Sequence, residues 1–179
     1  MNIKKCVFVL IAFCLCLNSF AQDSVQDLPR GYSDITLGLS LEDAKQNLTK
    51  NKIFGYRGER DVSLLPIQER VLIETEGSSF FNRCYFQFYD EKLYAITLNI
   101  NSKHMDYYSM FTTLKQKYGE PATFTPNKAE WKNDTVTMTL EKPLTIKYID
   151  SKVYDDLIDQ GKKAESTESI LRQKFLETF

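Results

Sequence analysis

The chain contains little cysteine or histidine outside one apolar stretch near its start. Of its four cysteines, three lie within residues 6–17 and only Cys84 follows them, while His104 is the single histidine. One cysteine cannot form an intramolecular disulfide, and one cysteine with one histidine supplies too few ligands for a zinc or iron–sulfur site. The sequence therefore predicts no disulfide framework, no metal and no cofactor.

Concentrated positive charge and phosphate-binding glycine loops are also missing. The 23 Lys and Arg residues are spread along the chain and balanced by 24 Asp and Glu residues, so no basic stripe offers a surface for nucleic acid. Gly55 and Gly58 lie in a segment without the strand-to-helix context of a nucleotide-binding motif. These absences disfavour nucleic-acid and nucleotide binding.

What the sequence does contain is a strong targeting pattern at its start. Two lysines precede the uncharged apolar run of residues 6–17, and Ser19 and Ala21 stand at positions −3 and −1 of a cleavage site. This is the layout of a secretory signal peptide, and the run is shorter than the roughly 20 residues that span a bilayer. We expect removal of residues 1–21, an exported and periplasmic protein that begins at Gln22, and no membrane span afterwards.

Two other destinations stay open. The protein could be secreted beyond the envelope, or it could be anchored by a lipid at Cys14 or Cys16. The lipid anchor is the weaker alternative, because Phe13 and Leu15 stand where the bacterial lipoprotein signal places a small residue.

The rest of the chain has the length and composition of one folded domain. Residues 22–160 suit a single α+β core. Residues 161–179 have the pattern of a polar linker followed by an amphipathic helical tail. A hydrophobic content of 42% and an aromatic content of 13% are typical of a globular protein.

Two main helices are delimited by their terminal residues. Ser40 is a good N-cap, and Asp43 completes a capping box, so a helix is predicted from there to about Asn51. The apolar spacing over residues 105–118 predicts a second helix, which ends at Gly119.

A β-hairpin is predicted over residues 80–100, with its turn at residues 90–92. The register that matches apolar side chains across the ladder opposes Cys84 with Leu98, Phe86 with Ile96, and Phe88 with Tyr94. A slip by one residue would oppose apolar with polar side chains, so we predict this register.

Further strands are predicted at residues 61–65 (ended by Pro66), at residues 71–75, and in a three-stranded segment after the second helix. In that segment the expected pairs are Trp131 with Val136, Ala129 with Met138, Met138 with Ile146, and Val136 with Tyr148. The opposite face is rich in threonine and carries Lys147, which indicates a surface open to water.

The predicted fold is therefore α+β. It is an antiparallel sheet of about six strands with two main helices, in which the helix-then-strands order occurs twice, followed by a C-terminal helical tail.

Two segments resemble small bacterial envelope proteins. These are Leu37-Gly38-Leu39-Ser40 before the first helix, and Leu114 to Pro121 (LKQKYGEP) before a strand that carries Trp131. The families of the outer-membrane assembly lipoprotein BamE and of the β-lactamase-inhibitor protein share this layout. Their known members bind other proteins, so the resemblance implies a binding role. This chain lacks the lipoprotein signal of the first and the paired cysteines of the second, and no site residue is carried over.

The candidate recognition residues lie on the polar face of the predicted hairpin. Tyr85, Gln87 and Tyr89 alternate there, with Arg83 before them, and Tyr and Arg are enriched in protein-recognition sites. The alternative is that a helix or residues 52–79 cover this face, which would make the tyrosines packing residues. Cys84 lies on the apolar face, where a thiol behaves as a small hydrophobic group rather than as a nucleophile.

These observations predict an exported, non-catalytic protein-binding domain of the bacterial envelope. It would be either an inhibitor or immunity-type protein or an accessory factor of envelope assembly, and its partner would be another protein of the envelope or periplasm. The alternative from a different class is a small extracytoplasmic hydrolase with carboxylates that the sequence does not identify. A pocket with two facing acids would favour the hydrolase, and a groove-like surface would favour binding.

Overall fold

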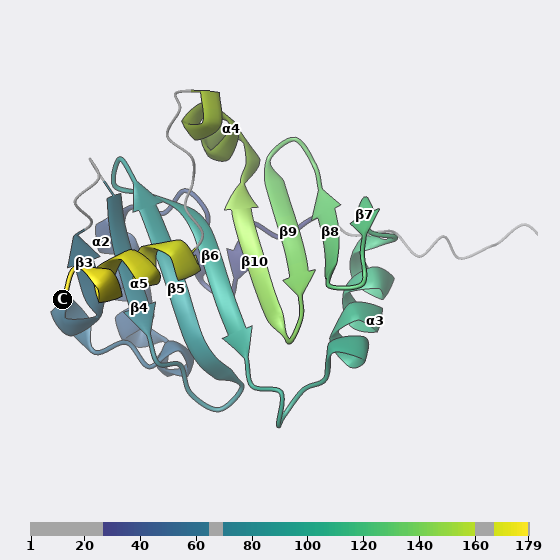
Figure 1. Ribbon diagram of the computed structural model, residues 1–179, viewed down its shortest axis with the longest axis horizontal. Coiled ribbons are helices and arrows are strands. Elements are labelled where there is room, and N and C mark those ends of the chain that lie inside the picture. The colour runs from purple at the N-terminus through teal and green to yellow at the C-terminus, as the bar shows by residue number, and fades with distance from the viewer. Residues whose placement is uncertain (1–26, 65–69, 160–166, 179) are drawn as a thin grey trace, which may run out of the picture.

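The computed structural model describes residues 27–64, 70–159 and 167–178. A helix followed by four strands occurs twice, as Figure 1 shows. The first unit contains α2 (Leu41–Lys50), β3 (Val62–Leu64), β4 (Arg70–Thr75), β5 (Phe81–Tyr89) and β6 (Lys92–Ile100). The second unit contains α3 (Tyr107–Tyr118), β7 (Thr123–Phe124), β8 (Lys128–Lys132), β9 (Val136–Glu141) and β10 (Thr145–Asp150). The remaining elements are β1 (Gly31–Tyr32), β2 (Ile35–Thr36), the 3-10 turns η2 (Lys52–Phe54) and η3 (Gly58–Asp61), α4 (Ser151–Asp159) and α5 (Thr167–Leu176).

The two units form one antiparallel sheet in the order β3-β4-β5-β6-β10-β9-β8-β7. Each unit is a four-stranded meander, and the units join through their last strands, β6 and β10. The predicted α+β class and antiparallel sheet are confirmed, but the main sheet has eight strands rather than about six. The additional edge strand β7 has two residues, which is too short to produce a recognisable period in the sequence.

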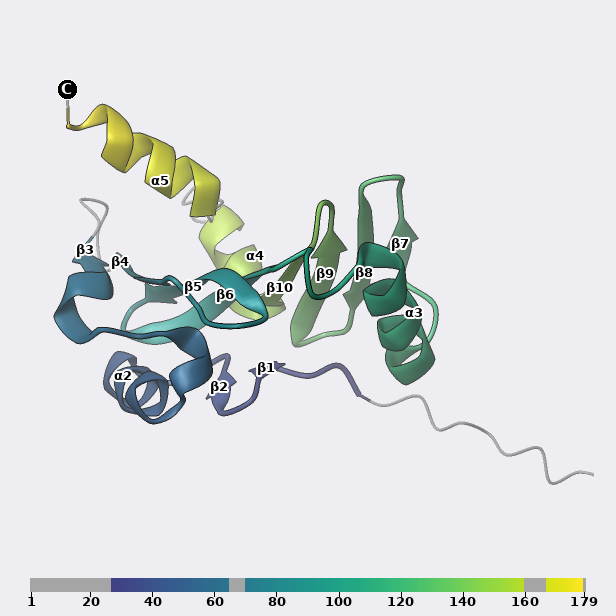
Figure 2. The same ribbon diagram turned by 90° about the horizontal axis from the view of Figure 1, so that it is seen from below.

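The sheet has an inner face and an outer face, as Figure 2 shows. On the inner face, α2, α3 and the β1–β2 pair lie against the strands, and on the outer face lie α4 and α5. The inner face buries the main core, in which Phe86, Ile96, Tyr148, Met138 and Trp131 stand in register across five strands. Burial of this continuous apolar row holds the two units together.

Both predicted main helices are confirmed. Before α2, the Ser40 hydroxyl accepts from the Asp43 backbone N–H at 3.1 Å and donates to the Asp43 carboxylate at 2.6 Å. The helix α3 begins two residues later than predicted, because Asp106 is its N-cap and accepts from the Ser109 backbone N–H at 2.9 Å. It ends at Gly119, whose φ of 79° lies in the region that favours glycine.

The predicted hairpin register is confirmed for Cys84 with Leu98 and for Phe86 with Ile96. The pairing of Phe88 with Tyr94 was wrong, since Phe88 pairs with Leu93. The turn contains only Asp90 and Glu91, both at positive φ (47° and 57°), so one residue of β6 is left over. That residue is Tyr94, which forms a β-bulge and joins the outer-face cluster instead of the main core.

The registers predicted for the second unit were wrong by two residues. Trp131 pairs with Met138, Tyr148 also pairs with Met138, and Ile146 pairs with Leu140. The β8–β9 loop is wider than predicted because the Asn133 side chain accepts from the backbone N–H groups of Thr135 and Val136 at 2.9 and 2.8 Å. A shift by two keeps every side chain on its predicted face, so the residues predicted for the core do lie in it.

Three predictions lie partly outside the described residues: the signal peptide at residues 1–21, the strand end at Pro66, and the linker at residues 161–166. The predicted C-terminal helix is present as α5, on which the Lys174 ammonium donates to the Ser63 hydroxyl of β3. Within the described ranges, no helix combines the length and apolar character needed to cross a bilayer.

Candidate binding site on the outer sheet face

A cavity of about 320 Å³ lies on the outer face of the second unit, and we call it the polar trough. Its walls come from β5, β6, β8, β9, β10 and the start of α4, so strands of the first unit contribute to it as well. Charged residues of both signs line it: Lys128, Lys132, Lys147, Glu130, Glu141 and Asp155. Figure 1 shows α5 in front of β4 and β5 and α4 at the end of β10, where Ser151 contacts Thr137 of β9.

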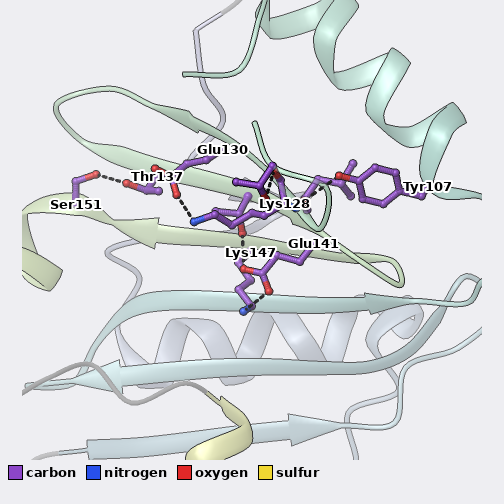
Figure 3. A network of polar contacts seen from close by, with 10 residues as sticks. Tyr107, Lys128, Glu130, Thr137, Glu141, Lys147 and Ser151 are labelled. Carbon is purple, nitrogen blue, oxygen red and sulfur yellow. Dashed lines mark hydrogen bonds and ion pairs between the residues drawn. The ribbon is translucent and has the colours of Figure 1, made fainter. Parts of the chain in front are cut away.

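The central charges of the trough are paired with one another, as Figure 3 shows. Lys128 Nζ lies 2.7 Å from Glu130 Oε2, and Lys147 Nζ lies 2.6 Å from Glu141 Oε2. The four side chains are partly buried, with exposed fractions between 22% and 38%. The Thr139 hydroxyl donates to Glu141 at 3.3 Å. The trough thus presents alternating charges that are already partly withdrawn from water.

Hydrogen bonds fix the end and the floor of the trough. At the end, the Thr137 and Ser151 hydroxyls lie 3.0 Å apart and tie α4 to β9. At the floor, the Tyr94 hydroxyl donates to the Gln87 amide oxygen at 3.0 Å, and both side chains are buried. Leu157 of α4 is fully buried against the cluster that contains Tyr94. These contacts indicate that the trough exists before any partner binds.

The four residues predicted for recognition lie on the outer face of β5 but do not form one exposed patch. Tyr85 and Gln87 are 6% and 5% exposed, and Tyr89 is partly buried. Arg83 is half-exposed and forms an ion pair with Glu74, which raises the pKa of the Arg83 guanidinium. Gln87 is the one of the four that lines the trough. Contact of all four with a partner stays a prediction.

Sequence reasoning missed the trough, although part of its pattern is visible in the sequence. Lys128, Glu130 and Lys132 alternate along one strand with opposite charges, which places them on one face. The prediction treated this face as an ordinary surface open to water. Instead Thr139 is only 3% exposed, because it stands in register between Glu130 of β8 and Lys147 of β10.

Cys84 and His104 are not arranged for nucleophilic catalysis. Cys84 is fully buried in the main core, and burial raises the pKa of its thiol to about 12, so it carries no thiolate at neutral pH. His104 follows β6, and its ring packs edge-on against the half-exposed Phe80 at 5.7 Å. Within the described ranges, no three His, Cys, Asp or Glu side chains gather as metal ligands.

The two glutamates of the trough do not have the arrangement expected for the hydrolase alternative. In register, Glu130 faces Thr139 and Glu141 faces Lys128, so the carboxylates are diagonal neighbours on adjacent strands. Each already has a lysine partner within 2.7 Å. A pair of acids that shares one substrate bond would instead have to face each other across a free gap.

Comparison with known proteins gives one match. The family model described as the TP0088 domain matches residues 30–160, which include both helix-and-strand units and α4. No curated protein and no solved structure matches the chain.

Proposed function

We propose that this chain, which belongs to the TP0088 domain family, is an exported, non-catalytic domain that binds another protein of the bacterial envelope. The polar trough is the proposed contact surface. The observation that supports the proposal is an alternating lysine and glutamate pattern on a rigid sheet face that is left open in the second unit.

Mixed, partly buried charges favour a protein partner. Such charges contribute specificity and association rate, because a partner with the complementary pattern replaces each ion pair while a mismatched one meets like charge. Lys147 and Glu141 are only 27% and 29% exposed, so part of their desolvation cost is already met in the free protein. The trough is also open, which suits a protruding segment of another protein better than a substrate that must be enclosed.

The inhibitor or immunity role and the assembly role both stay within this proposal. Either would use the trough to recognise a polar segment with alternating charge. Export through removal of residues 1–21 is part of the same proposal, since the partner belongs to the envelope. The intact mass of the exported protein should equal that of a chain that begins at Gln22. A mass that includes residues 1–21 would contradict export with cleavage.

Site-specific photo-crosslinking in the native envelope tests the contact surface. A crosslinker at Lys132, which is exposed in the trough, should give one discrete adduct with another protein. The same crosslinker at Lys50, exposed at the end of α2, should give none. No adduct from position 132, or equal adducts from both positions, would contradict the proposal.

A double charge swap gives the matched control. Exchanging Glu141→Lys with Lys147→Glu keeps the ion pair and the fold but inverts the charge pattern, so the adduct should be lost while the melting temperature changes little. The same swap at the ion pair of Glu74 and the half-exposed Arg83 should leave the adduct intact. If only the second swap removes the adduct, the partner binds beside Arg83 on β5, where the sequence predicted the contact, rather than in the trough.

A further inference from the structure

The inner face carries a second cavity, which we call the apolar cleft. It measures about 340 Å³ and lies between β1, α3 and the strands beneath them. Its walls include Met105, Met110 and Leu114 from the α3 region, with Ile100 and Ile146 from the sheet. This volume is within the range of about 300–1,000 Å³ typical of small-molecule sites. Figure 2 shows β1 and α3 on the same side of the sheet.

Three tyrosines give the apolar cleft a polar group. Tyr32, Tyr118 and Tyr148 all line it. Tyr148 is 4% exposed, and among the described residues its hydroxyl has no hydrogen-bond partner. Burial raises the pKa of Tyr148, and Tyr118 and Tyr32 raise it further, so the hydroxyl keeps its proton and can donate. The hydroxyl oxygen is not sealed from solvent, so it is reached from the cleft that Tyr148 lines, and a ligand oxygen there can accept a hydrogen bond from it.

Positive charge also lines the apolar cleft. Lys117 lines the apolar cleft beside Tyr118, in the last turn of α3. The helix C-terminus carries about half a negative charge, which is smaller than the full charge of the ammonium. The Gly119 carbonyl is also occupied, since the Trp131 indole donates to it at 2.9 Å. The net field at this end of the cleft therefore favours an anionic head group.

The cleft is polarised along its length. Met105 and Met110 lie at the start of α3, and Lys117 and Tyr118 lie at its end. We propose that the apolar cleft binds a medium-chain fatty acid, with its alkyl chain along the methionines and its carboxylate at the hydroxyl of Tyr148 and the ammonium of Lys117. This site is on the opposite face of the sheet from the polar trough, so its failure and that of the proposed protein contact are separate results.

Calorimetric titration of the purified protein with laurate tests the proposal. Laurate should bind with one-to-one stoichiometry, and dodecylamine, which has the same chain and the opposite charge, should bind at least about tenfold more weakly. Tyr148→Phe removes only the unpaired hydroxyl and should weaken laurate binding by about tenfold, the expected loss for a hydrogen bond to a charged group. Lys117→Met should weaken it similarly.

Two matched variants separate the site from the rest of the surface. Tyr108→Phe changes a tyrosine that is 76% exposed outside the cleft, and Lys115→Met changes a lysine paired with Glu120 in the same helix. Both should bind laurate as the unchanged protein does. Absence of laurate binding, equal binding of dodecylamine, or unchanged affinity in Tyr148→Phe and Lys117→Met would overturn the proposal. If Tyr148→Phe does not fold, Lys117→Met against Lys115→Met decides the result.

Discussion

The two units have the same element order but differ on both of their faces. In the first unit, α2 buries Ala44 and Leu48 almost completely against the sheet, and Tyr85 and Gln87 are buried on the outer face of β5. In the second unit, α3 fully buries only Leu114, and the outer face is hollowed into the polar trough. The same local pattern of helix and meander therefore gives a closely packed helix face in the first unit and a looser one in the second, and both cavities lie where the second unit meets the first.

The two cavities draw unequally on the two units. The charged residues of the polar trough lie on β8 to β10 and α4, while β5 and β6 contribute uncharged residues to it. The apolar cleft lies between α3, β1 and residues of β5, β6 and β10. The first unit contributes a dense aromatic cluster, in which the rings of Phe54, Phe81 and Phe86 lie within 6.1 Å of a neighbour. We infer that the first unit stabilises the sheet on which the second unit displays its binding groups.

The substitution with the largest expected effect on stability tests whether the two units unfold together. Phe86→Ala in the first unit removes a fully buried ring and should lower the free energy of unfolding by about 3–5 kcal/mol. Trp131 is the only tryptophan and lies in the second unit. Because β6 and β10 are paired, the urea midpoint seen by Trp131 fluorescence should fall as much as the midpoint seen by circular dichroism. An unchanged Trp131 midpoint would mean that the second unit unfolds independently.

A second prediction concerns the pH dependence of stability in the first unit. The folded pKa of Cys84 is raised to about 12 by burial, whereas an unfolded thiol has a pKa of about 8.5. The unfolded chain therefore loses this proton first, and stability falls as pH rises between these values. Between about pH 9 and about pH 11, the free energy of unfolding of the unchanged protein should fall by about 2–3 kcal/mol more than that of the Cys84→Ala variant.

Urea unfolding of the unchanged protein and of the Cys84→Ala variant at each pH isolates the effect of Cys84, because the other titrating groups contribute equally to both. Equal losses in both would show that Cys84 is reached by solvent in the folded state, and would reopen its interpretation as a reactive thiol.

The accuracy of the sequence predictions also differs between the units. The register of β5 with β6 was predictable because apolar residues oppose apolar residues in only one alignment. In the second unit, alignments two residues apart both match apolar faces, so the choice depended on the loop. The Asn133 side chain decides it through hydrogen bonds to Thr135 and Val136, and the number of residues that such a loop spans is not visible in the periodicity.

The candidate site was less predictable than the fold, for a related reason. Alternation along a strand shows that Tyr85 and Lys147 point to the outer face, but it does not show which stretch of that face a later segment covers. The position of α4 at the end of β10, and that of α5 beside β3, depend on contacts distant in sequence, such as the one between Lys174 and Ser63.

The smallest expected changes in the free energy of unfolding concern the hairpin turns of the two units. In the β5–β6 turn, Glu91 holds a φ of 57°, which is strained for a residue with a Cβ atom, and glycine is preferred at this position of a two-residue turn. Glu91→Gly should therefore raise the free energy of unfolding by about 0.5–1 kcal/mol. In the β8–β9 loop, Asn133→Ala removes three hydrogen bonds to the Asn133 side chain and should lower the free energy of unfolding by about 1–2 kcal/mol. Urea unfolding measures both, and a loss of stability in Glu91→Gly would show that the Glu91 side chain stabilises the first unit by more than its backbone strain costs.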